Sequence, residues 1–128
     1  MFTYCTPVSF LGAVCVVANI VVTPPSFKAH TAVVGHPYTI PCDATVDADV
    51  RWFFHSGRAF WYVYDFGNIF EEFIARFSYN TSVRGLDISM VYPSDSGKYT
   101  CIERNGQGDH HIHQLTVIGK WTNVKLNL

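Results

Sequence analysis

Short apolar runs separated by Gly, Pro, Asp and Ser make up most of the chain after residue 25. In several of them apolar and polar residues alternate, which is typical of strands that are buried on one face. The clearest strand segments are 38–42, 50–55, 60–64, 74–79, 86–91, 98–104 and 113–118. Residues 56–58 (Ser-Gly-Arg) form the turn of a hairpin between two of them. No segment has a convincing apolar stripe of helical period, so eight or nine short strands predict an all-β sandwich.

Pro41 conflicts with this pattern because it lacks the N–H group that a paired strand position needs. We expect it to lie where no ladder hydrogen bond is made. Within the same segment, Tyr38, Ile40 and Cys42 are expected to point inward.

The first 25 residues differ from the rest, since no charged residue precedes Lys28. The apolar run 8–22 is shorter than the roughly 20 residues that span a bilayer, and its length and position fit a secretory signal peptide. Small residues at 16 and 18 favour cleavage before Asn19. An uncut signal-anchor and a buried strand are the alternatives. The expected organisation is a signal peptide (1–18), a linker (19–25), a domain (26–120) and a C-terminal tail (121–128).

The cysteines support an oxidising compartment if that segment is removed. Cys5 and Cys15 would leave with it, and Cys42 and Cys101 would remain as an even pair. A bridge between them would close a loop of about 60 residues and stabilise the domain by roughly 4 kcal/mol. Two buried free thiols are the alternative.

A glycosylation signal adds to this picture. The triplet 80–82 (Asn-Thr-Ser) makes Asn80 an acceptor for an N-linked glycan. Such triplets also occur by chance, but behind a signal peptide this one favours a surface glycan. We therefore expect a secreted, extracellular protein, with membrane anchoring through residues 8–22 as the alternative.

Residues 86–101 carry a resemblance to a known family. They read LDISMVYPSDSGKYTC and match the run L-x-I-x-x-V…D-x-G-x-Y-x-C, while Trp52 follows Cys42 by ten residues. Over about 26–120 the chain resembles a single immunoglobulin domain of the variable type (V-set), similar to those of innate receptors and adhesion molecules. The resemblance implies a sandwich of two antiparallel sheets joined by a Cys42–Cys101 disulfide.

The same resemblance implies roles for the core. Trp52 would pack on the disulfide, Tyr99 would bond to backbone near Asp95, and Arg76 would pair with the Asp95 carboxylate. Gly97 would supply a backbone angle that other residues resist. The last strand lacks the G-x-G bulge of antigen-receptor variable domains, which argues against pairing of that kind. Because little sequence follows that strand, a soluble form or decoy is expected.

Motifs of enzyme sites are absent from the sequence. It contains no G-x-S-x-G, H-E-x-x-H, P-loop or C-x-x-C, so neither catalysis nor a cofactor is expected. Residues 109–113 (Asp-His-His-Ile-His) put His111 and His113 on one face of an extended segment, where they are weak candidates for Zn²⁺ or Cu²⁺ ligands. The alternatives are a pH-sensitive contact and a polar loop tip.

Protein binding is the favoured function. The net charge of −1 gives no basic field for nucleic acid, and aromatics form 16% of the chain. The strand 60–64 (Phe-Trp-Tyr-Val-Tyr) cannot bury all its rings, because neighbours point to opposite faces. The resemblance implies a protein-binding sheet face crowned by the loop 105–110. The candidate partner-binding residues are Arg51, Phe53, His55, Tyr62, Arg104, Asn105, Gln107 and His110.

We expect a non-catalytic binding module for a cell-surface or secreted protein, acting in immune recognition or cell adhesion. The alternative is a structural or assembly subunit that uses the same aromatic face for a homodimer or as a membrane-anchored form.

Overall fold

The computed structural model describes residues 3–8, 12–17, 25–45 and 49–121, the first two segments by their backbone alone. Within 25–121 it contains nine strands in two sheets. The strands are β3 (Ser26–Val33), β4 (Tyr38–Ile40), β5 (Arg51–Ser56), β6 (Ala59–Asp65), β7 (Asn68–Ile69), β8 (Phe77–Asn80), β9 (Gly85–Ile88), β10 (Gly97–Ile102) and β11 (His110–Ile118). Two short helices, η1 (Pro93–Asp95) and α1 (Glu103–Gly106), flank β10.

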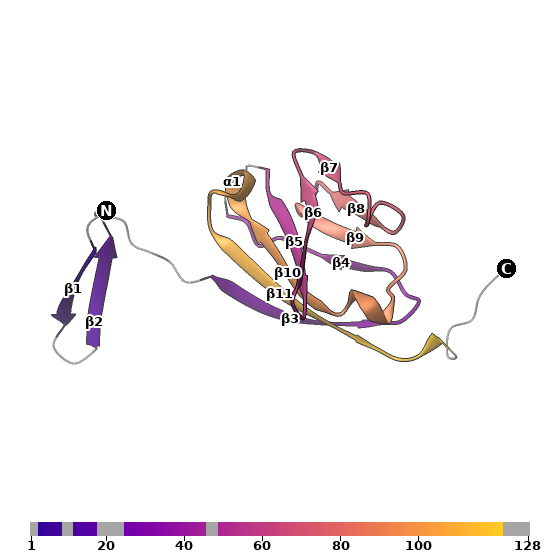
Figure 1. Cartoon of the computed structure of the whole chain (residues 1–128), viewed down its shortest axis with the longest axis horizontal. Helices are drawn as coiled ribbons and strands as arrows, with labels where there is room; N and C mark the ends of the chain where they lie inside the picture. The colour runs from indigo at the N-terminus through magenta and orange to yellow at the C-terminus, as the bar shows by residue number, and fades with distance from the viewer. Residues whose placement is uncertain (1–2, 9–11, 18–24, 46–48, 122–128) are drawn as a thin grey trace.

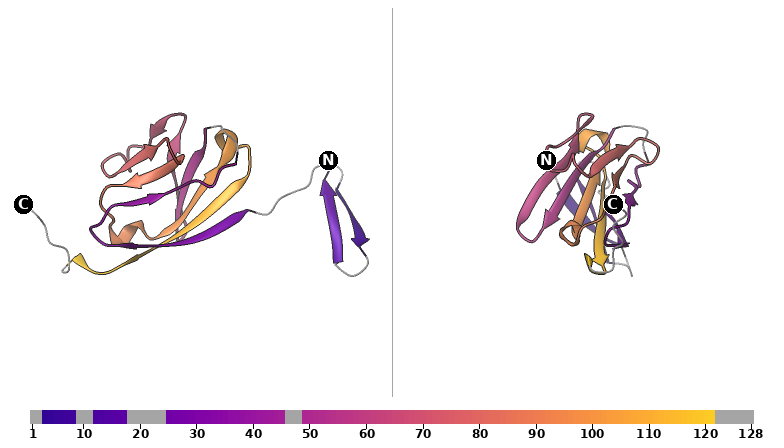
Figure 2. Two further views of the ribbon diagram at one scale, coloured as in Figure 1. Left: turned by 180° about the vertical axis from the view of Figure 1, so that it is seen from behind. Right: turned by 90° about the vertical axis from the view of Figure 1, so that its right-hand side faces the viewer.

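The two sheets pack face to face as a sandwich (Figures 1 and 2). The larger sheet has the order β3-β11-β10-β5-β6-β7, and the smaller has β4-β9-β8. All pairings are antiparallel except that of β3 with β11. The strands β6 and β7 extend the larger sheet beyond β5. The predicted all-β sandwich is confirmed, and its topology is immunoglobulin-like.

β1 (Thr3–Val8) and β2 (Gly12–Val17) form an antiparallel pair that makes a sheet of its own. The predicted cleavage point before Asn19 lies outside the described residues, so the signal peptide stays a prediction.

The core is built around the disulfide between Cys42 and Cys101, whose Cα atoms lie 6.0 Å apart. The predicted bridge is therefore confirmed. Trp52 is fully buried and donates a hydrogen bond from its indole Nε1 to the Arg84 carbonyl oxygen at 3.0 Å. Other fully buried apolar side chains around it include Ile40, Val50, Leu86, Ile88, Leu115 and Tyr99. The alternation in 38–42 and 50–55 thus predicted the inward face correctly.

The turn before β10 joins the two sheets at one end. The Arg76 guanidinium donates to both Asp95 carboxylate oxygens, at 2.6 and 2.8 Å, and the Tyr99 hydroxyl donates to the Asp95 carbonyl oxygen at 2.7 Å. These are the contacts that the resemblance implied. Gly97 is needed here for space as well as for its φ of 155°, because a Cβ would lie 2.5 Å from the His55 carbonyl oxygen.

Most of the predicted strands have somewhat different bounds in the structure, among them 74–79, 86–91 and 98–104. The segment 74–79 is a strand only from Phe77, because Arg76 N–H donates to the Phe73 carbonyl in a series of turns that leaves Ile74 exposed. The segment 86–91 pairs only to Ile88. The segment 98–104 stops at Ile102, since α1 follows it directly.

Pro41 and Trp121 lie just beyond the ends of strands. The strand β4 ends at Ile40, so Pro41 stands outside the ladder and its missing N–H costs nothing. After β11, the Trp121 ring packs edge-on against Tyr92 with centroids 4.9 Å apart, one residue beyond the predicted domain boundary.

Candidate functional site

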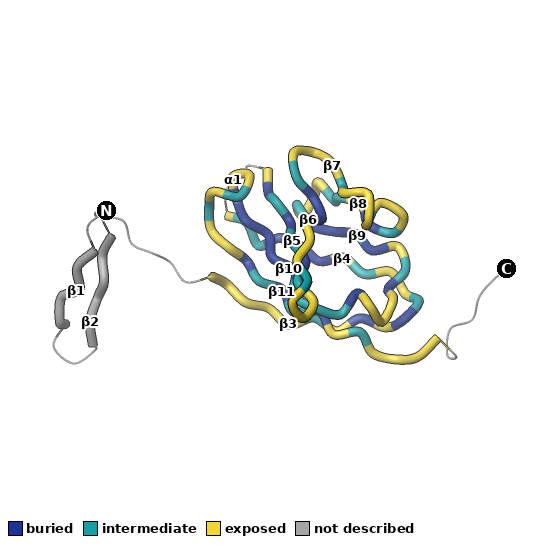
Figure 3. The backbone as a smooth tube through the Cα atoms, viewed as in Figure 1, coloured by how far each residue is buried: buried dark blue, intermediate teal, exposed yellow. Residues whose placement is uncertain are grey.

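Five aromatic rings gather on the outer surface of β5, β6 and the turn around β7, and we call them the aromatic face. They are Phe53, Phe60, Tyr62, Phe66 and Phe70. Phe53 lies 5.1 Å from Phe60 and 4.9 Å from Tyr62 between ring centroids, and Tyr62 stacks on Phe70 at 5.7 Å. Four of the five are exposed, from 38% at Phe70 to 70% at Phe66. The turn at β7 is coloured mainly as exposed in Figure 3. This is a contiguous apolar surface on one side of one sheet.

Alternation along β6 and one register shift shape this surface. Phe60 and Tyr62 pair with His55 and Phe53 and point outward with them, whereas the shift at Trp52/Phe53 makes Val63 an extra residue of β6, so that Tyr64 turns inward as well. The turn between β6 and β7 then brings Phe66 to the same side with a positive φ of 48°. Sequence alternation predicted that some rings of 60–64 would be exposed, which the structure confirms.

Charged groups on the aromatic face balance one another. The Arg51 Nε atom lies 3.1 Å from an Asp65 carboxylate oxygen. The Arg51 guanidinium also lies 5.9 Å from the Tyr62 ring centroid and 5.7 Å from that of Phe66. His55 packs on Phe60 at 4.8 Å, and its pKa is lowered by burial and by the nearby Lys98. The face is therefore aromatic, with one ion pair set into it.

The loop between β10 and β11 stands at one end of this face. Arg104, Asn105 and Gly106 all have positive φ, and the Arg104 and Asn105 side chains are exposed together with Gln107 and His110. Such backbone persists only where neighbours hold it. The Asn105 N–H donates to the Asp49 carbonyl at 3.0 Å, and a Cβ on Gly106 would lie 2.8 Å from the Arg51 guanidinium. The loop thus adjoins Arg51.

A buried carboxylate anchors the same loop. Glu103 is 2% exposed and accepts hydrogen bonds from the Thr45 N–H and from His111, whose Nε2 lies 3.2 Å away. Burial alone raises the pKa of Glu103, but these hydrogen bonds outweigh burial and the pKa is lowered. The other ring nitrogen of His111 lies 2.6 Å from the Ser26 hydroxyl. This chain of contacts ties the loop to β3.

The histidines of residues 109–113 are not a polar loop tip, and that interpretation was wrong. His111 and His113 do share one face, but they belong to β11 and point into the sandwich, because β11 already begins at His110. They have separate partners: His111 contacts Ser26 and Glu103, while His113 contacts His30 at 2.8 Å. Within the described residues, no three His, Cys, Asp or Glu side chains gather as a metal site.

His113 makes the stability of the domain depend on pH. Its ring is fully buried against Trp52, and its pKa is lowered to about 4 by burial first and then by His30, with Asp43 opposing and Lys28 adding to the effect. The pKa of His30 is lowered too, chiefly by burial, and its other ring nitrogen lies 2.7 Å from the Tyr38 hydroxyl. Both imidazoles are therefore neutral at pH 7.

We expect acid to destabilise the fold through this pair. Below the ordinary histidine pKa of 6.5 the unfolded chain binds more protons than the folded one, so stability falls as the pH drops from 6.5 to about 4. The loss from His113 is roughly 3 kcal/mol. Urea unfolding at pH 7, 5.5 and 4 measures it. His113→Gln should flatten this pH dependence, and His36→Gln, in an exposed turn, should preserve it. Equal slopes in wild type and His113→Gln would contradict the assignment.

The structure brings four predicted binding residues together on one face, namely Arg51, Phe53, His55 and Tyr62. It places the other four, Arg104, Asn105, Gln107 and His110, in or next to the adjoining loop. Sequence reasoning missed Phe66, Phe70 and Asp65. Their only signal was their position directly after an aromatic strand, which does not reveal the turn that returns them to the same side.

Asn80 ends β8, the edge strand of the smaller sheet. It is half-buried, its side-chain oxygen accepts from the Ser82 N–H at 3.0 Å, and its amide nitrogen lies 3.3 Å from the Asp87 carboxylate. Its glycosylation stays a prediction.

Comparisons with known proteins identify the fold. No protein-family model matches the sequence, and no curated protein matches it. Several solved structures, in contrast, are similar to this chain in fold. The extracellular domain of the voltage-gated sodium channel beta4 subunit, described as a parallel homodimer with a role in cell–cell adhesion, is 18% identical, with a TM-score of 0.59 over 77% of this chain and 97% of that one.

Two further structures agree. One is from the ZIG-8–RIG-5 IG1–IG1 heterodimer, at 21% identity and a TM-score of 0.60 over 77% of this chain and 88% of that one. The other is Drosophila Semaphorin 2a, at 19% identity and a TM-score of 0.56 over 75% of this chain and 15% of that one. These likenesses show an immunoglobulin-like fold.

Of the described helices, none has the length and apolar character needed to cross a bilayer.

Proposed function

We propose that the chain is an extracellular V-set domain of the immunoglobulin superfamily that binds a protein partner through its aromatic face, without catalysis. The observation that carries this proposal is the cluster of exposed rings on β5, β6 and the β7 turn. Large exposed aromatic side chains that lie in contact are the residues most often found as energetic anchors of protein interfaces.

The chemistry of the surface favours a protein partner. Its charged side chains on β5 and β6, Arg51 and Asp65, neutralise each other, so the contact surface offered by these two strands is chiefly apolar. The loop of Arg104 and Asn105 is held in a fixed shape beside it, which lowers the entropy cost of binding. The sodium channel beta4 and ZIG-8–RIG-5 structures bear this fold and associate as a homodimer and a heterodimer.

The proposed location is extracellular. The Cys42–Cys101 disulfide fits an oxidising compartment, and the predicted signal peptide and the Asn80 triplet fit secretion. Under this proposal the protein is a secreted recognition module or decoy. Anchoring through residues 8–22 is the alternative.

A homodimer is the second candidate, and one observation favours it. The aromatic face carries both a cation, Arg51, and an anion, Asp65, which lie 3.1 Å apart. A surface of mixed charge can be complementary to itself under two-fold symmetry. The same face would then serve assembly instead of recognition of a different protein.

Substitution of two rings tests both candidates. Phe60→Ser combined with Tyr62→Ser removes two exposed rings, which are 46% and 41% accessible, and should weaken binding by at least about 30-fold. Phe27→Ser, which changes a 63% exposed ring on β3 of the same sheet, is the matched control and should bind as wild type does.

Two assays separate the candidates. Aggregation of beads coated with the protein, together with sedimentation equilibrium, reports self-association, and staining of a panel of cells with labelled protein reports a different partner. Self-association of the wild type supports the assembly role, and staining without it supports recognition. A double variant that behaves like wild type in every assay would contradict the use of the aromatic face.

A further inference from the structure

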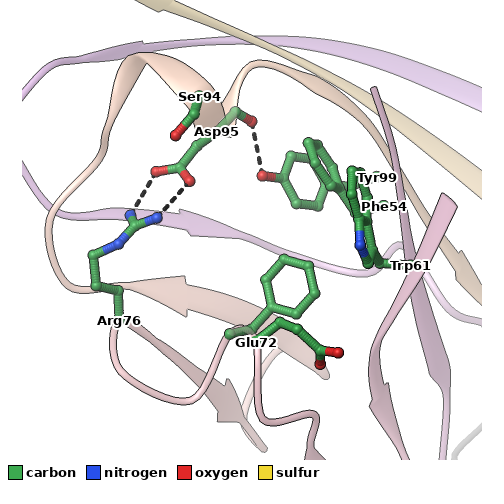
Figure 4. A pocket seen from close by; sticks show the side chains of 8 residues that line it. Phe54, Trp61, Glu72, Arg76, Ser94, Asp95 and Tyr99 are labelled. Carbon is green, nitrogen blue, oxygen red and sulfur yellow. Dashed lines mark hydrogen bonds and ion pairs between the residues drawn. The ribbon is translucent and has the colours of Figure 1, made fainter. Parts of the chain in front are cut away.

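A pocket of about 250 Å³ lies on the opposite side of the larger sheet from the aromatic face (Figure 4). One wall is aromatic and comes from Phe54 on β5, Trp61 on β6 and Tyr99 on β10. The other walls come from Glu72, Phe73 and Arg76, between β7 and β8, and from residues 94–95 of η1. Because neighbours on a strand point to opposite faces, Trp61 points away from Phe60 and Tyr62. The pocket is therefore separate from the proposed partner-binding surface.

The aromatic wall is open to an incoming group. The Trp61 ring stacks on Phe54 with centroids 5.6 Å apart and planes 20° apart. Phe54 is buried, but Trp61 keeps 37% of its surface accessible. Phe73 meets Phe54 edge-on at 6.3 Å and forms the floor beside it. The faces of these rings carry negative potential and attract cations, most strongly at tryptophan.

The charges around the pocket leave one carboxylate without a counter-ion. Arg76 and Asp95 neutralise each other through two hydrogen bonds of 2.6 and 2.8 Å. Glu72 is exposed at the rim and has no ion pair or hydrogen bond within the described residues, and in Figure 4 its carboxylate is turned away from Arg76. The exposed Ser94 hydroxyl stands on the opposite wall.

We propose that this pocket binds the guanidinium group of an arginine side chain presented by a protein partner. A planar guanidinium stacks on a tryptophan ring and at the same time donates two parallel hydrogen bonds to a carboxylate, which are the roles open to Trp61 and Glu72. The volume is just below the range of about 300–1,000 Å³ typical of sites for drug-sized ligands, so it suits a single side chain. The site does not depend on the aromatic face and would contact a partner at a second place.

A titration with N-acetyl-L-arginine methylamide tests the proposal. This probe presents the side chain between two peptide bonds, as a protein does. We expect a saturable shift of the Trp61 indole N–H signal in ¹⁵N-labelled protein, with a dissociation constant of roughly millimolar size. The matching citrulline derivative has nearly the same shape and no charge, and it should bind at least about fivefold more weakly.

Variants locate the site. Glu72→Gln should weaken binding of the arginine probe about threefold to tenfold, because it removes the charge and keeps the size. Glu71→Gln changes the neighbouring exposed carboxylate, which does not line the pocket, and should leave binding unchanged. Trp61→Leu, followed through the Ser94 amide signal, should weaken binding by a similar factor. Equal binding of the arginine and citrulline probes, or equal effects of Glu71→Gln and Glu72→Gln, would overturn the proposal.

Discussion

Replacement of Arg76 by alanine is expected to lower the free energy of unfolding by about 3–5 kcal/mol. Asp95 is only 5% exposed, and its carboxylate depends on two hydrogen bonds from Arg76. Without the guanidinium, the buried negative charge would keep the Tyr92 N–H, at 2.7 Å, as its one hydrogen-bond donor among the described residues. Removal of one partner of a buried pair is far more costly than replacement of both, because the remaining charge stays desolvated.

Arg76 has further contacts that increase this cost. It donates to the Met90 carbonyl at 2.7 Å, and its guanidinium lies 3.8 Å from the centroid of the Tyr92 ring. The hydrogen bonds to Asp95 are the main cause that raises the pKa of Arg76, so the group is charged at every pH at which the domain is folded. Arg76→Lys keeps the charge but loses the bidentate geometry, and it should have an intermediate stability.

Guanidinium-induced unfolding, followed by tryptophan fluorescence, measures the effect. Arg58→Ala changes an exposed arginine in the turn between β5 and β6, and its effect should stay within about 0.5 kcal/mol of wild type. If Arg76→Ala were no less stable than Arg58→Ala, the pair would not be the link between the sheets that its geometry indicates.

The resemblance of the run 86–101 to variable-type immunoglobulin domains predicted this end of the domain well, because the residues that it involves lie close together in the chain. Asp95, Gly97 and Tyr99 all take part in the turn before β10, and Cys101 forms the disulfide two residues further on. Alternation predicted the buried faces of β4 and β5 for a similar reason, since a one-residue slip would put polar groups into the core.

Other features depend on long-range packing, and the sequence could not reveal them. His111 and His113 are polar residues close to Asp109, yet they are buried, because this part of β11 lies between β10 and β3 and turns them toward the inside of the sandwich. Tyr64 would point outward by simple alternation, but the register shift between β5 and β6 turns it inward, and nothing in the residues 60–64 marks that shift. The pocket beside Trp61 combines three segments that are far apart in the chain.

The largest effect on stability apart from Arg76 is expected from loss of the disulfide. Cys42→Ala combined with Cys101→Ala should lower the free energy of unfolding by about 4 kcal/mol, because the bridge closes a loop with a sequence separation of 59. Both cysteines are changed so that no free thiol remains to form other bonds.

The bridge also fills space in the core, since Cys101 is fully buried and Cys42 is 7% exposed, so the double variant loses packing as well as the constraint on the unfolded chain. The thermal midpoint should fall by roughly 20 °C, as measured by circular dichroism.

Wild-type protein treated with a reducing agent supplies the control, because it loses the same covalent constraint and keeps both sulfur atoms. If the reduced wild type is more stable than the double variant, the difference in their free energies of unfolding is the contribution that the two sulfur atoms make by packing. Unfolding of the double variant within about 1 kcal/mol of the oxidised wild type would show that the sheets are held by their apolar contacts and the Arg76–Asp95 pair instead of by the disulfide.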